Sequence, residues 1–580
     1  MLWHLGNTTV RTPYRLRDAL LAIHGTTFNG NIIGRVRENE FAAHLHDLGV
    51  LNSPRVENGE DASDLGRKWR AALSQLGFIT PTLTRRANAG SRDPKLTEIT
   101  DRIEGLSDRP FEITPNGMRL MNCELLTAQQ ECFLRALVSY RIPSILETRY
   151  DAEAFSPLRH VLKVFGCITE QGGEAKLSFQ EFALLVQTST PADGAANIAE
   201  SILTFREGRR AAAGNVRAYD RHYYDRVASE LDKSPDTLDD YADLSFRYLK
   251  ATGLFRNAGR GLALNPIKYQ LCELLKEEVE QPLNNDAYLI QLWQGAELPT
   301  DNVEASAIVV QDLSDRLHGR GEEVVQPPAG AELRELEHLR FDLENRLVQL
   351  DEQAFADDQV NRLDEISAWM DAIPSRGSAT LPNGDRVIIP KGEGPAYLEW
   401  VIWRAFLAIN SLSNKVWEAR RFQIDQDFLP VHCAPRGGPD MIFEFEDVII
   451  VVEVTLTASS RQEAAEGEPV RRHVANIAED TDKEVFGLFV ALQIDSNTAH
   501  TFRSGDWYRP DDSKMSLQIV PMTLSDFQTL FESGKGRFNQ MPALLRQVML
   551  ECRSRANEDA PVWKETINQV IGWHSQRKTT

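Results

Sequence analysis

The sequence has few cysteines, and they are not spaced to hold a metal or a disulfide framework. The six lie at positions 123, 132, 167, 272, 433 and 552, without a C-x-x-C pair or a nearby run of histidines. Structural zinc sites and disulfide-rich folds need such spacing, so we expect free thiols. The first residues lack an apolar signal core, and the apolar run Val448–Val452 is far too short to span a bilayer. These absences predict a cytoplasmic protein without a membrane partner.

Positive charge is scarce, since 64 lysines and arginines face 85 acidic residues and the net charge is -21. Nonspecific coating of nucleic acid depends on lysine and arginine displacing counterions, so this function is disfavoured. The charges are unevenly spread. Residues 1–35 contain four arginines and only one acid, Asp18, whereas residues 351–371 carry seven carboxylates and only Arg362. Acidic charge is therefore concentrated away from the N-terminal arm.

The length of 580 residues predicts three or four folding units at roughly 150 residues per domain. With 42% hydrophobic and 26% charged residues, the composition is that of ordinary globular proteins. We divide the chain into a mainly α-helical part at 1–285, a helical linker at 286–390 and an α/β unit at 391–580. The sequence therefore predicts a multi-domain protein.

Residues 1–285 show the alternation of helices and short strand pairs that is typical of winged-helix modules. A helix at 69–76 ends at Gly77 and precedes a strand at 78–80. The partner strand is predicted at 111–114, ending in a turn at Pro115-Asn116-Gly117.

A second copy of this pattern follows, with a helix at 246–250, a break at Gly253 and strands at 254–255 and 262–264. The loop between these strands carries Arg256 and Arg260. It either lies along a phosphate backbone or is simply an exposed hairpin tip, and the loop taken alone favours the hairpin tip.

The linker segment contains a strongly charged helix with one apolar seam, formed by leucines at positions 336, 339, 343, 347 and 350. Fewer than three heptads are present, so we expect packing within a domain and not a freestanding coiled coil. In the last segment we place strands at 448–454, 485–492 and 517–520 and helices at 395–410, 469–480 and 540–555. This order predicts a mixed sheet with helices on both faces.

Asp440 and Glu453 occupy corresponding positions in a predicted hairpin. If Glu446 and Asp447 form its turn, position 445 pairs with 448, 444 with 449 and finally 440 with 453. Opposed residues have Cβ atoms about 4.5 to 5.5 Å apart, close enough for both carboxylates to bind one Mg²⁺. Acids at the ends of a purely structural sheet are the alternative, but the buried strand before Glu453 favours a metal-dependent nuclease. The metal would polarise a phosphoryl oxygen and lower the pKa of its bound water.

Three further polar residues are candidates for the same site. Glu399 lies in a helix with almost entirely apolar faces, so its carboxylate requires either a site role or a salt bridge such as one with Arg404. Pro469 suits the first position of a helix, which leaves Glu466 in the preceding loop. His473 then either orients a water or contacts a phosphate, or is an ordinary residue near a helix start.

Three stretches of the chain resemble a known family. They are Trp3–Arg17, Tyr397–Trp403 and Gly438–His473, the last with Pro439-Asp440 followed by Glu453-Val454-Thr455. The last stretch resembles the PD-(D/E)XK nuclease core. The closer likeness is to the AlwI family of type IIS restriction endonucleases and the related site-specific nicking endonucleases, and it spans most of the chain.

The resemblance implies that residues 391–580 form a PD-(D/E)XK nuclease domain in which Asp440 and Glu453 bind Mg²⁺. It implies that the catalytic set is completed by Glu399, Glu466 and His473. The superfamily's usual lysine, two positions after the second acid, is replaced by Thr455, which looks normal for the AlwI-like branch. A cationic group for water activation then either comes from elsewhere or is absent, and His473 or Arg472 is our hypothesis for a substitute.

The resemblance also implies that residues 1–285 recognise double-stranded DNA through two winged-helix-like modules. Arg11, Arg15 and Arg17 then contact phosphate or guanine and do not simply form a solvated helix face. The implied function is restriction of foreign DNA by cutting a few bases outside a short asymmetric site, beside a cognate methyltransferase. The single active site either nicks one strand or pairs with a second subunit or transient dimer to cut both. The alternative is a sequence-specific DNA-binding protein whose nuclease-like domain does not cleave, and the intact Asp440 and Glu453 count against it.

Overall fold

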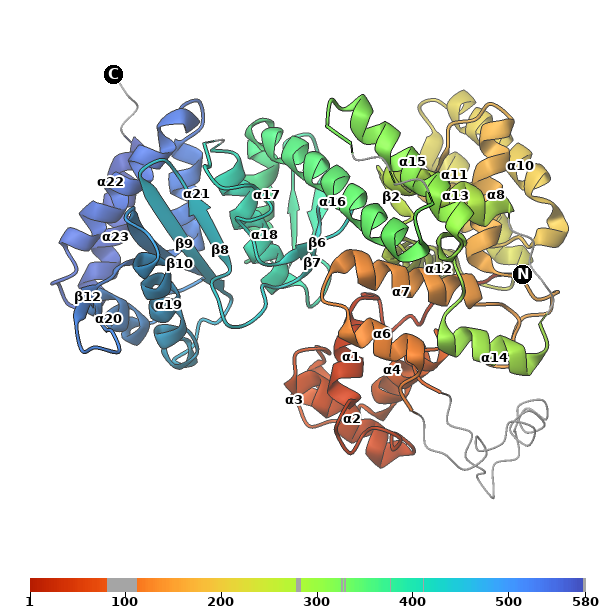
Figure 1. Cartoon of the computed structure of the whole chain (residues 1–580), viewed down its shortest axis with the longest axis horizontal. Coiled ribbons are helices and arrows are strands. Elements are labelled where there is room, and N and C mark those ends of the chain that lie inside the picture. Colours follow the sequence, from red (N-terminus) through yellow and green to blue (C-terminus); the bar gives the residue numbers. More distant parts are fainter. Residues whose placement is uncertain are drawn as a thin grey trace. The chain divides into compact units, whose positions relative to one another are not determined.

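The computed structural model of the chain describes residues 1–80, 112–277, 283–324, 327, 330–375, 377–409 and 411–576. These residues form two compact units, Met1–Arg346 and Leu347–Thr580 (Figure 1). The predicted division into a recognition region at 1–285, a linker at 286–390 and a nuclease domain at 391–580 is a division by function, and it stays a prediction. No helix in the described ranges is long and apolar enough to cross a membrane.

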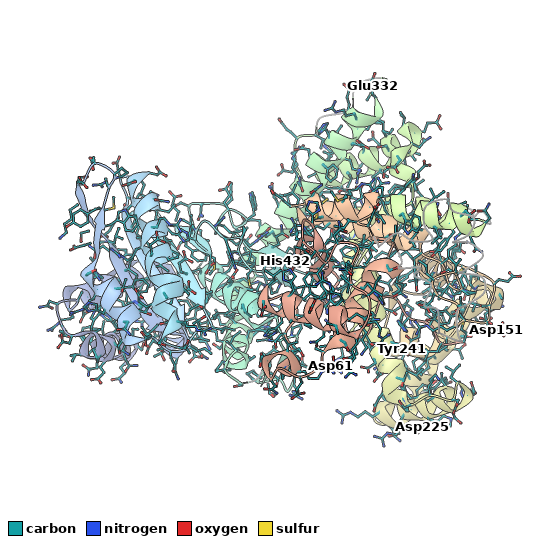
Figure 2. The ribbon with its side chains drawn as sticks, turned by 90° about the horizontal axis from the view of Figure 1, so that it is seen from below. Asp61, Asp151, Asp225, Tyr241, Glu332 and His432 are labelled. Atoms are coloured by element: carbon teal, nitrogen blue, oxygen red, sulfur yellow. The ribbon has the colours of Figure 1, made fainter. Side chains whose placement is uncertain are left out.

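The first unit is mainly helical. Its surface carries exposed carboxylates, among them Asp61, Asp151, Asp225 and Glu332 (Figure 2). In the described part of this unit, the α-helices of four residues or more are α1 (Arg15–Ile23), α2 (Arg35–Asp47), α3 (Pro54–Glu57), α4 (Ser63–Gln75), α6 (Pro115–Asn122), α7 (Leu126–Ser139), α8 (Pro157–Glu170), α10 (Ala195–Ala211), α11 (Val216–Glu230), α12 (Pro235–Ala251), α13 (Tyr269–Glu277), α14 (Asn285–Gln294) and α15 (Val303–Gly319).

Helix α16 (Leu333–Asp357) runs from the first unit into the second. Its predicted apolar seam is confirmed, because Leu336, Leu343 and Leu347 are at most 2% exposed. The other two leucines of the seam, Leu339 and Leu350, are half-buried. The seam therefore packs inside the protein, as expected for a helix too short to form a coiled coil alone.

The first predicted strand pair is present only as a single bridge between Ile79 and Ile113. Part of its second strand, at 111, lies outside the described residues. The predicted turn at 115–117 is wrong, because α6 begins at Pro115. The Thr114 side chain accepts a hydrogen bond from the backbone N of Gly117, and proline fits the first helical position, so these residues start a helix.

The second predicted hairpin is present and belongs to a three-stranded antiparallel sheet. Its first strand is longer than predicted, so Arg256 lies in that strand, paired with Ala263, and not in the loop. Strands β2 (Phe255–Ala258) and β3 (Gly261–Leu264) are joined by Gly259 and Arg260, and β1 (Lys176–Leu177) pairs with β3 on the other side. Helix α12 directly precedes the hairpin. The assignment of this helix and hairpin to a winged-helix module stays a prediction.

The second unit contains the predicted mixed sheet, with the strand order β13-β10-β9-β8. Strands β9 (Val448–Thr455), β10 (Glu484–Ala491) and β13 (Gln518–Thr523) are parallel, and β8 (Met441–Glu444) is antiparallel to β9. The unbroken apolar runs of β9 and β10 match strands that are covered on both faces.

Helices cover the two faces of this sheet (Figure 1). On one face Phe406 of α18 (Gly394–Leu407) stacks on Phe443 of β8 at 4.0 Å and on Phe527 of α21 (Leu524–Ser533). On the other face Val474 of α19 (Arg461–Glu479) lies against Gly487, where a Cβ would be 2.7 Å from its side chain. The other helices and strands are α17 (Leu363–Ala372), β4 (Ser378–Thr380), β5 (Arg386–Ile388), β6 (Gln423–Ile424), β7 (Pro430–His432), α20 (Ser496–Ser504), β11 (Asp506–Tyr508), β12 (Lys514–Ser516), α22 (Met541–Ser554) and α23 (Ala560–Gln576).

Helix α19 begins earlier than the sequence predicted. Its start is Arg461 and not Pro469, so Glu466 lies within the helix and not in a loop. The reason is an anchor in the first turn: the buried Gln462 side chain donates to the carbonyl oxygens of Thr457 and Gln493. This anchor fixes the helix upstream of Pro469. The proline costs the helix one backbone hydrogen bond, because it has no N–H to donate to the preceding turn.

Candidate active site

Asp440 and Glu453 face each other where β8 meets β9. The paired ladder ends with Met441 opposite Val452, and it continues the predicted register, which places Asp440 opposite Glu453. Oδ2 of Asp440 accepts a hydrogen bond of 2.8 Å from the backbone N of Val454, so the carboxylate reaches across to the neighbouring strand. The hairpin therefore brings together two acids that lie at the carboxyl end of a buried parallel strand.

The environment of these acids favours a positive ligand. Burial raises the pKa of Asp440 well above its ordinary value, and the adjacent Glu453 raises it further. Burial also raises the pKa of Glu453 to about 8, with Glu466 acting in the same direction. These raised pKa values mean that the protein alone does not offset the cost of burying the negative charges. A bound cation would offset that cost.

Glu399 belongs to the same cluster and not to a salt bridge with Arg404. Its Oε2 accepts a hydrogen bond of 2.7 Å from the backbone N of Ala434. Burial, followed by the charge of Asp440, raises its pKa well above the ordinary value. Arg404 instead donates to Gln359 and Glu365, at 2.7 and 2.8 Å.

Glu466 and His473 project from α19, two turns apart on one side of the helix. Nδ1 of His473 lies 2.5 Å from Oε1 of Glu453 and shares a hydrogen bond with it. Nε2 of His473 is buried and has no hydrogen-bond partner among the described residues. Burial raises the pKa of Glu466, while a hydrogen bond from Thr455 opposes that rise. The threonine in place of the usual lysine therefore contacts another predicted site residue.

Arg421 is a neighbour of this cluster that the sequence did not reveal. Its backbone N donates to the carbonyl oxygen of Asp440 at 3.1 Å, and its Nη1 donates to that of Pro439 at 3.2 Å. The pairing of Arg420 with Met441 aligns this segment along β8. No motif spacing pointed to it, because the contact depends on an edge pairing between segments twenty residues apart in the chain.

The predicted DNA-contacting arginines lie in different surroundings. Arg11 forms ion pairs with Asp240 and Asp243 of α12, at 3.0 and 3.2 Å. Arg15 donates to the carbonyl oxygen of Gly49, and Nε of Arg17 is buried without a partner among the described residues. The other two, Arg256 and Arg260, are exposed on the hairpin of β2 and β3. Their contacts with DNA stay predictions.

The donor set fits Mg²⁺ as a carboxylate pair and not as a complete cage. Within the described ranges, no group of three or more His, Cys, Asp or Glu side chains is arranged to hold a metal ion. Mg²⁺ commonly uses one or two carboxylates and completes its shell with water and substrate phosphate. Asp440 and Glu453 meet that requirement, and the buried unpaired Nε2 of His473 beside them marks a site that is not closed by the protein itself.

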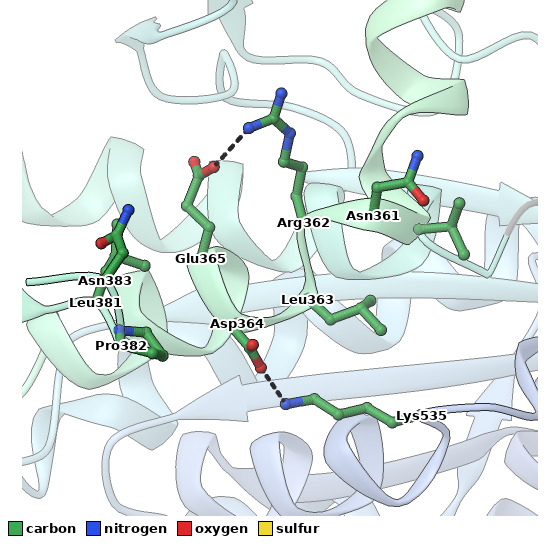
Figure 3. Close-up of a pocket in the computed structure, with 10 residues that line it drawn as sticks. Asn361, Arg362, Leu363, Asp364, Glu365, Leu381, Pro382, Asn383 and Lys535 are labelled. Carbon is green, nitrogen blue, oxygen red and sulfur yellow. Dashed lines mark hydrogen bonds and ion pairs between the residues drawn. The ribbon is translucent and has the colours of Figure 1, made fainter. Parts of the chain in front are cut away.

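A cavity of about 510 Å³ in the second unit is a poorer candidate. Figure 3 shows that its charged residues pair with one another, Asp364 with Lys535 at 2.9 Å and Arg362 with Glu365 at 3.9 Å. None of the predicted site residues is among those that line it. The acid cluster beside β9 remains the site at which sequence and geometry agree.

A buried sheet that presents two opposed acids and a histidine beside them has the make-up of a nuclease. The family model of the AlwI restriction endonuclease matches residues 74–530. This chain belongs to that family and is a site-specific nuclease that acts on DNA.

The crystal structure of the small subunit (R.BspD6I2) of the heterodimeric restriction endonuclease R.BspD6I is similar over 37% of this chain and 98% of that chain, with 22% sequence identity and a TM-score of 0.28. No curated protein matches the chain.

Proposed function

We propose that this chain is a Mg²⁺-dependent type IIS endonuclease that recognises a short asymmetric site and cuts a few bases outside it. The observation that carries the proposal is the juxtaposition of Asp440 and Glu453 at the end of a buried strand, with Oδ2 of Asp440 bonded to the backbone of Val454. A metal held there would polarise the scissile phosphate and favour ionisation of the attacking water.

The side chains around the pair have distinct tasks in this proposal. His473 holds Glu453 in a fixed orientation through the 2.5 Å hydrogen bond. Glu466, whose pKa is raised by burial, accepts a proton from the attacking water. The water oxygen forms a bond to phosphorus, the bond from phosphorus to O3′ breaks, and O3′ takes a proton from solvent. The products are a 5′-phosphate and a 3′-hydroxyl.

Recognition belongs to the first unit in this proposal. Helix α12 carries Asp236, Asp239, Asp240 and Asp243, so its acidic side is unsuited to a phosphate backbone. The hairpin of β2 and β3 offers Arg256 and Arg260 to solvent instead. We propose that this hairpin lies along DNA as the wing of a winged-helix module, while Arg11 neutralises part of the acidic helix.

Restriction of foreign DNA requires protection of the host, so a cognate methyltransferase is the expected partner in the same system. One set of Asp440, Glu453 and His473 per chain acts on one phosphodiester at a time. Cutting both strands at once therefore needs a second subunit or a transient dimer, whereas nicking needs neither.

The experiment is incubation of the purified full chain with supercoiled plasmid in Mg²⁺, followed by sequencing of the product ends. We expect nicked or linear DNA with ends at a fixed offset from one sequence, and no product in EDTA. Asp440→Asn should abolish cleavage. Glu444→Gln changes an acid of the same hairpin that is paired with Lys483 at 2.8 Å, and it should leave cleavage intact. A gel shift without product in Mg²⁺ would instead support the alternative, a DNA-binding protein that does not cleave.

A further inference from the structure

Two buried acids, Glu399 and Glu453, and the half-buried Asp440 and Glu466 crowd the proposed site, and the substrate adds the negative charge of a phosphate. A cation other than the metal can stabilise the negative charge that develops on the phosphoryl oxygens during hydrolysis. Thr455 cannot supply it. A cation in this role would come from a residue that the folded chain brings to Asp440 and Glu453.

The two cations suggested by the sequence are already occupied. Arg472 is held on its own helix by Glu468, with Nε and Oε1 2.9 Å apart. His473 is buried and uses Nδ1 for its hydrogen bond to Glu453. Neither group presents a positive charge that is free to meet a phosphate.

Arg421 differs from these two residues because both its backbone and its guanidinium are held by hydrogen bonds next to Asp440. Its backbone donates to Asp440 and its Nη1 donates to Pro439, the residue directly before that acid. A Cβ on Gly438 would lie 2.2 Å from Nη1, so the guanidinium lies against the backbone of Gly438. Glycine is needed at position 438 because the Arg421 guanidinium occupies the space that a side chain at this position would fill.

The charge of Arg421 acts on the site residues. Its positive charge is close enough to act on both Glu453 and His473. A guanidinium carries five N–H donors in a plane, and the bond to Pro439 uses only one nitrogen. The half-buried side chain retains donors for a second acceptor.

We propose that Arg421 is a catalytic residue of this nuclease and that its guanidinium binds a non-bridging oxygen of the scissile phosphate, in the place of the missing lysine. This inference rests on the proposed function and deepens it. Arginine suits the task because its planar guanidinium can bond two phosphate oxygens at once, whereas a lysine supplies only a point charge.

The test is single-turnover cleavage of plasmid or of a cognate duplex by the full-length protein and its variants. Arg421→Ala should lower the rate constant by about 100- to 1,000-fold, the usual cost of losing one donor to a developing negative charge. The Kd for DNA, measured in Ca²⁺, should change by less than about threefold, because phosphate contacts elsewhere supply most of the affinity. Arg421→Lys should restore part of the rate. Added guanidinium at non-denaturing concentration should rescue Arg421→Ala.

Arg546→Ala is the matched control. Arg546 is an arginine of the same unit paired with Glu484, at the opposite end of β10 from the site, and its loss should not change the rate.

Cleavage by Arg421→Ala within threefold of the wild-type rate would overturn the inference. So would a loss that guanidinium cannot rescue and that follows a matching loss of folding. If Asp440→Asn is inactive while Arg421→Ala is fully active, the proposed function survives and only the role of Arg421 falls. If Asp440→Asn itself remains active, the proposed site falls with it.

Discussion

Nδ1 of His473 lies 2.5 Å from Oε1 of Glu453, although the two residues are twenty positions apart in the chain. The histidine comes from a helix on one face of the sheet and the glutamate from the end of a central strand. A group that fixes the orientation of a metal-binding carboxylate typically contributes 10- to 100-fold to metal affinity or activity. This contact is therefore the support on which the proposed metal pair depends.

The first prediction concerns that contact. His473→Ala should lower single-turnover cleavage by about 10- to 100-fold and raise the Mg²⁺ concentration needed for half-maximal activity. His574→Ala removes a comparable pair, since His574 of α23 lies 2.9 Å from Glu551 of α22, and these two helices contribute no residue to the site, so the rate should be unchanged. Equal rates for wild type and His473→Ala across the Mg²⁺ titration would show that the histidine has no supporting role.

The second prediction uses the space beside Arg421. Gly438→Ala places a Cβ 2.2 Å from Nη1, so the guanidinium must move and cleavage should fall. The cost in stability should stay at about 1–3 kcal/mol, the usual range for overpacking. Gly572→Ala, in a helix where a new Cβ meets nothing within 4 Å, is the control and should be neutral or slightly stabilising. Full activity of Gly438→Ala would mean that the arginine position is not critical.

A third prediction concerns the ion pair that holds the neighbouring Arg420. Its guanidinium makes two bonds of 2.8 Å to Glu352, which is 1% exposed. Arg420→Ala would leave a buried carboxylate without its partner and should destabilise the second unit by about 3–5 kcal/mol. Urea unfolding measures this loss. The double variant with Glu352→Gln should recover part of it, and a loss below about 1 kcal/mol would contradict the predicted importance of the pair.

The prediction for pH concerns His160 in the first unit. Burial lowers its pKa to about 4, from an ordinary value of 6.5, and its Nε2 shares a hydrogen bond with Ser189. Between these two values the unfolded chain binds a proton that the folded chain does not, so stability rises with pH from about 4 to 6.5 and is flat above that range. His160→Asn should flatten this dependence by up to about 3 kcal/mol in chemical unfolding at several pH values. If the free energy of unfolding of His160→Asn depended on pH as it does in the wild type, the pKa of His160 would not be lowered in the folded protein.

Much of the site could be predicted because it lies on strongly patterned elements. The alternation around the acidic turn fixed the register of β8 and β9, and thereby the partner of Asp440. The start of α19 could not be predicted, because a distant contact of Gln462 with Gln493 overrides the local signal of Pro469. The position of Arg421 beside the site could not be predicted either. It depends on the pairing of Arg420 with Met441 at the sheet edge, and this pairing produces no repeating pattern in the sequence.

The central claim is that Asp440 and Glu453 hold one divalent ion together. The most direct measurement is binding of Mn²⁺, as a spectroscopic substitute for Mg²⁺, to the full chain with cognate DNA, followed by electron paramagnetic resonance. The account predicts that Asp440→Asn and Glu453→Gln each abolish a site present in the wild type, while Glu444→Gln retains it. Unchanged Mn²⁺ binding in both site variants would contradict the account.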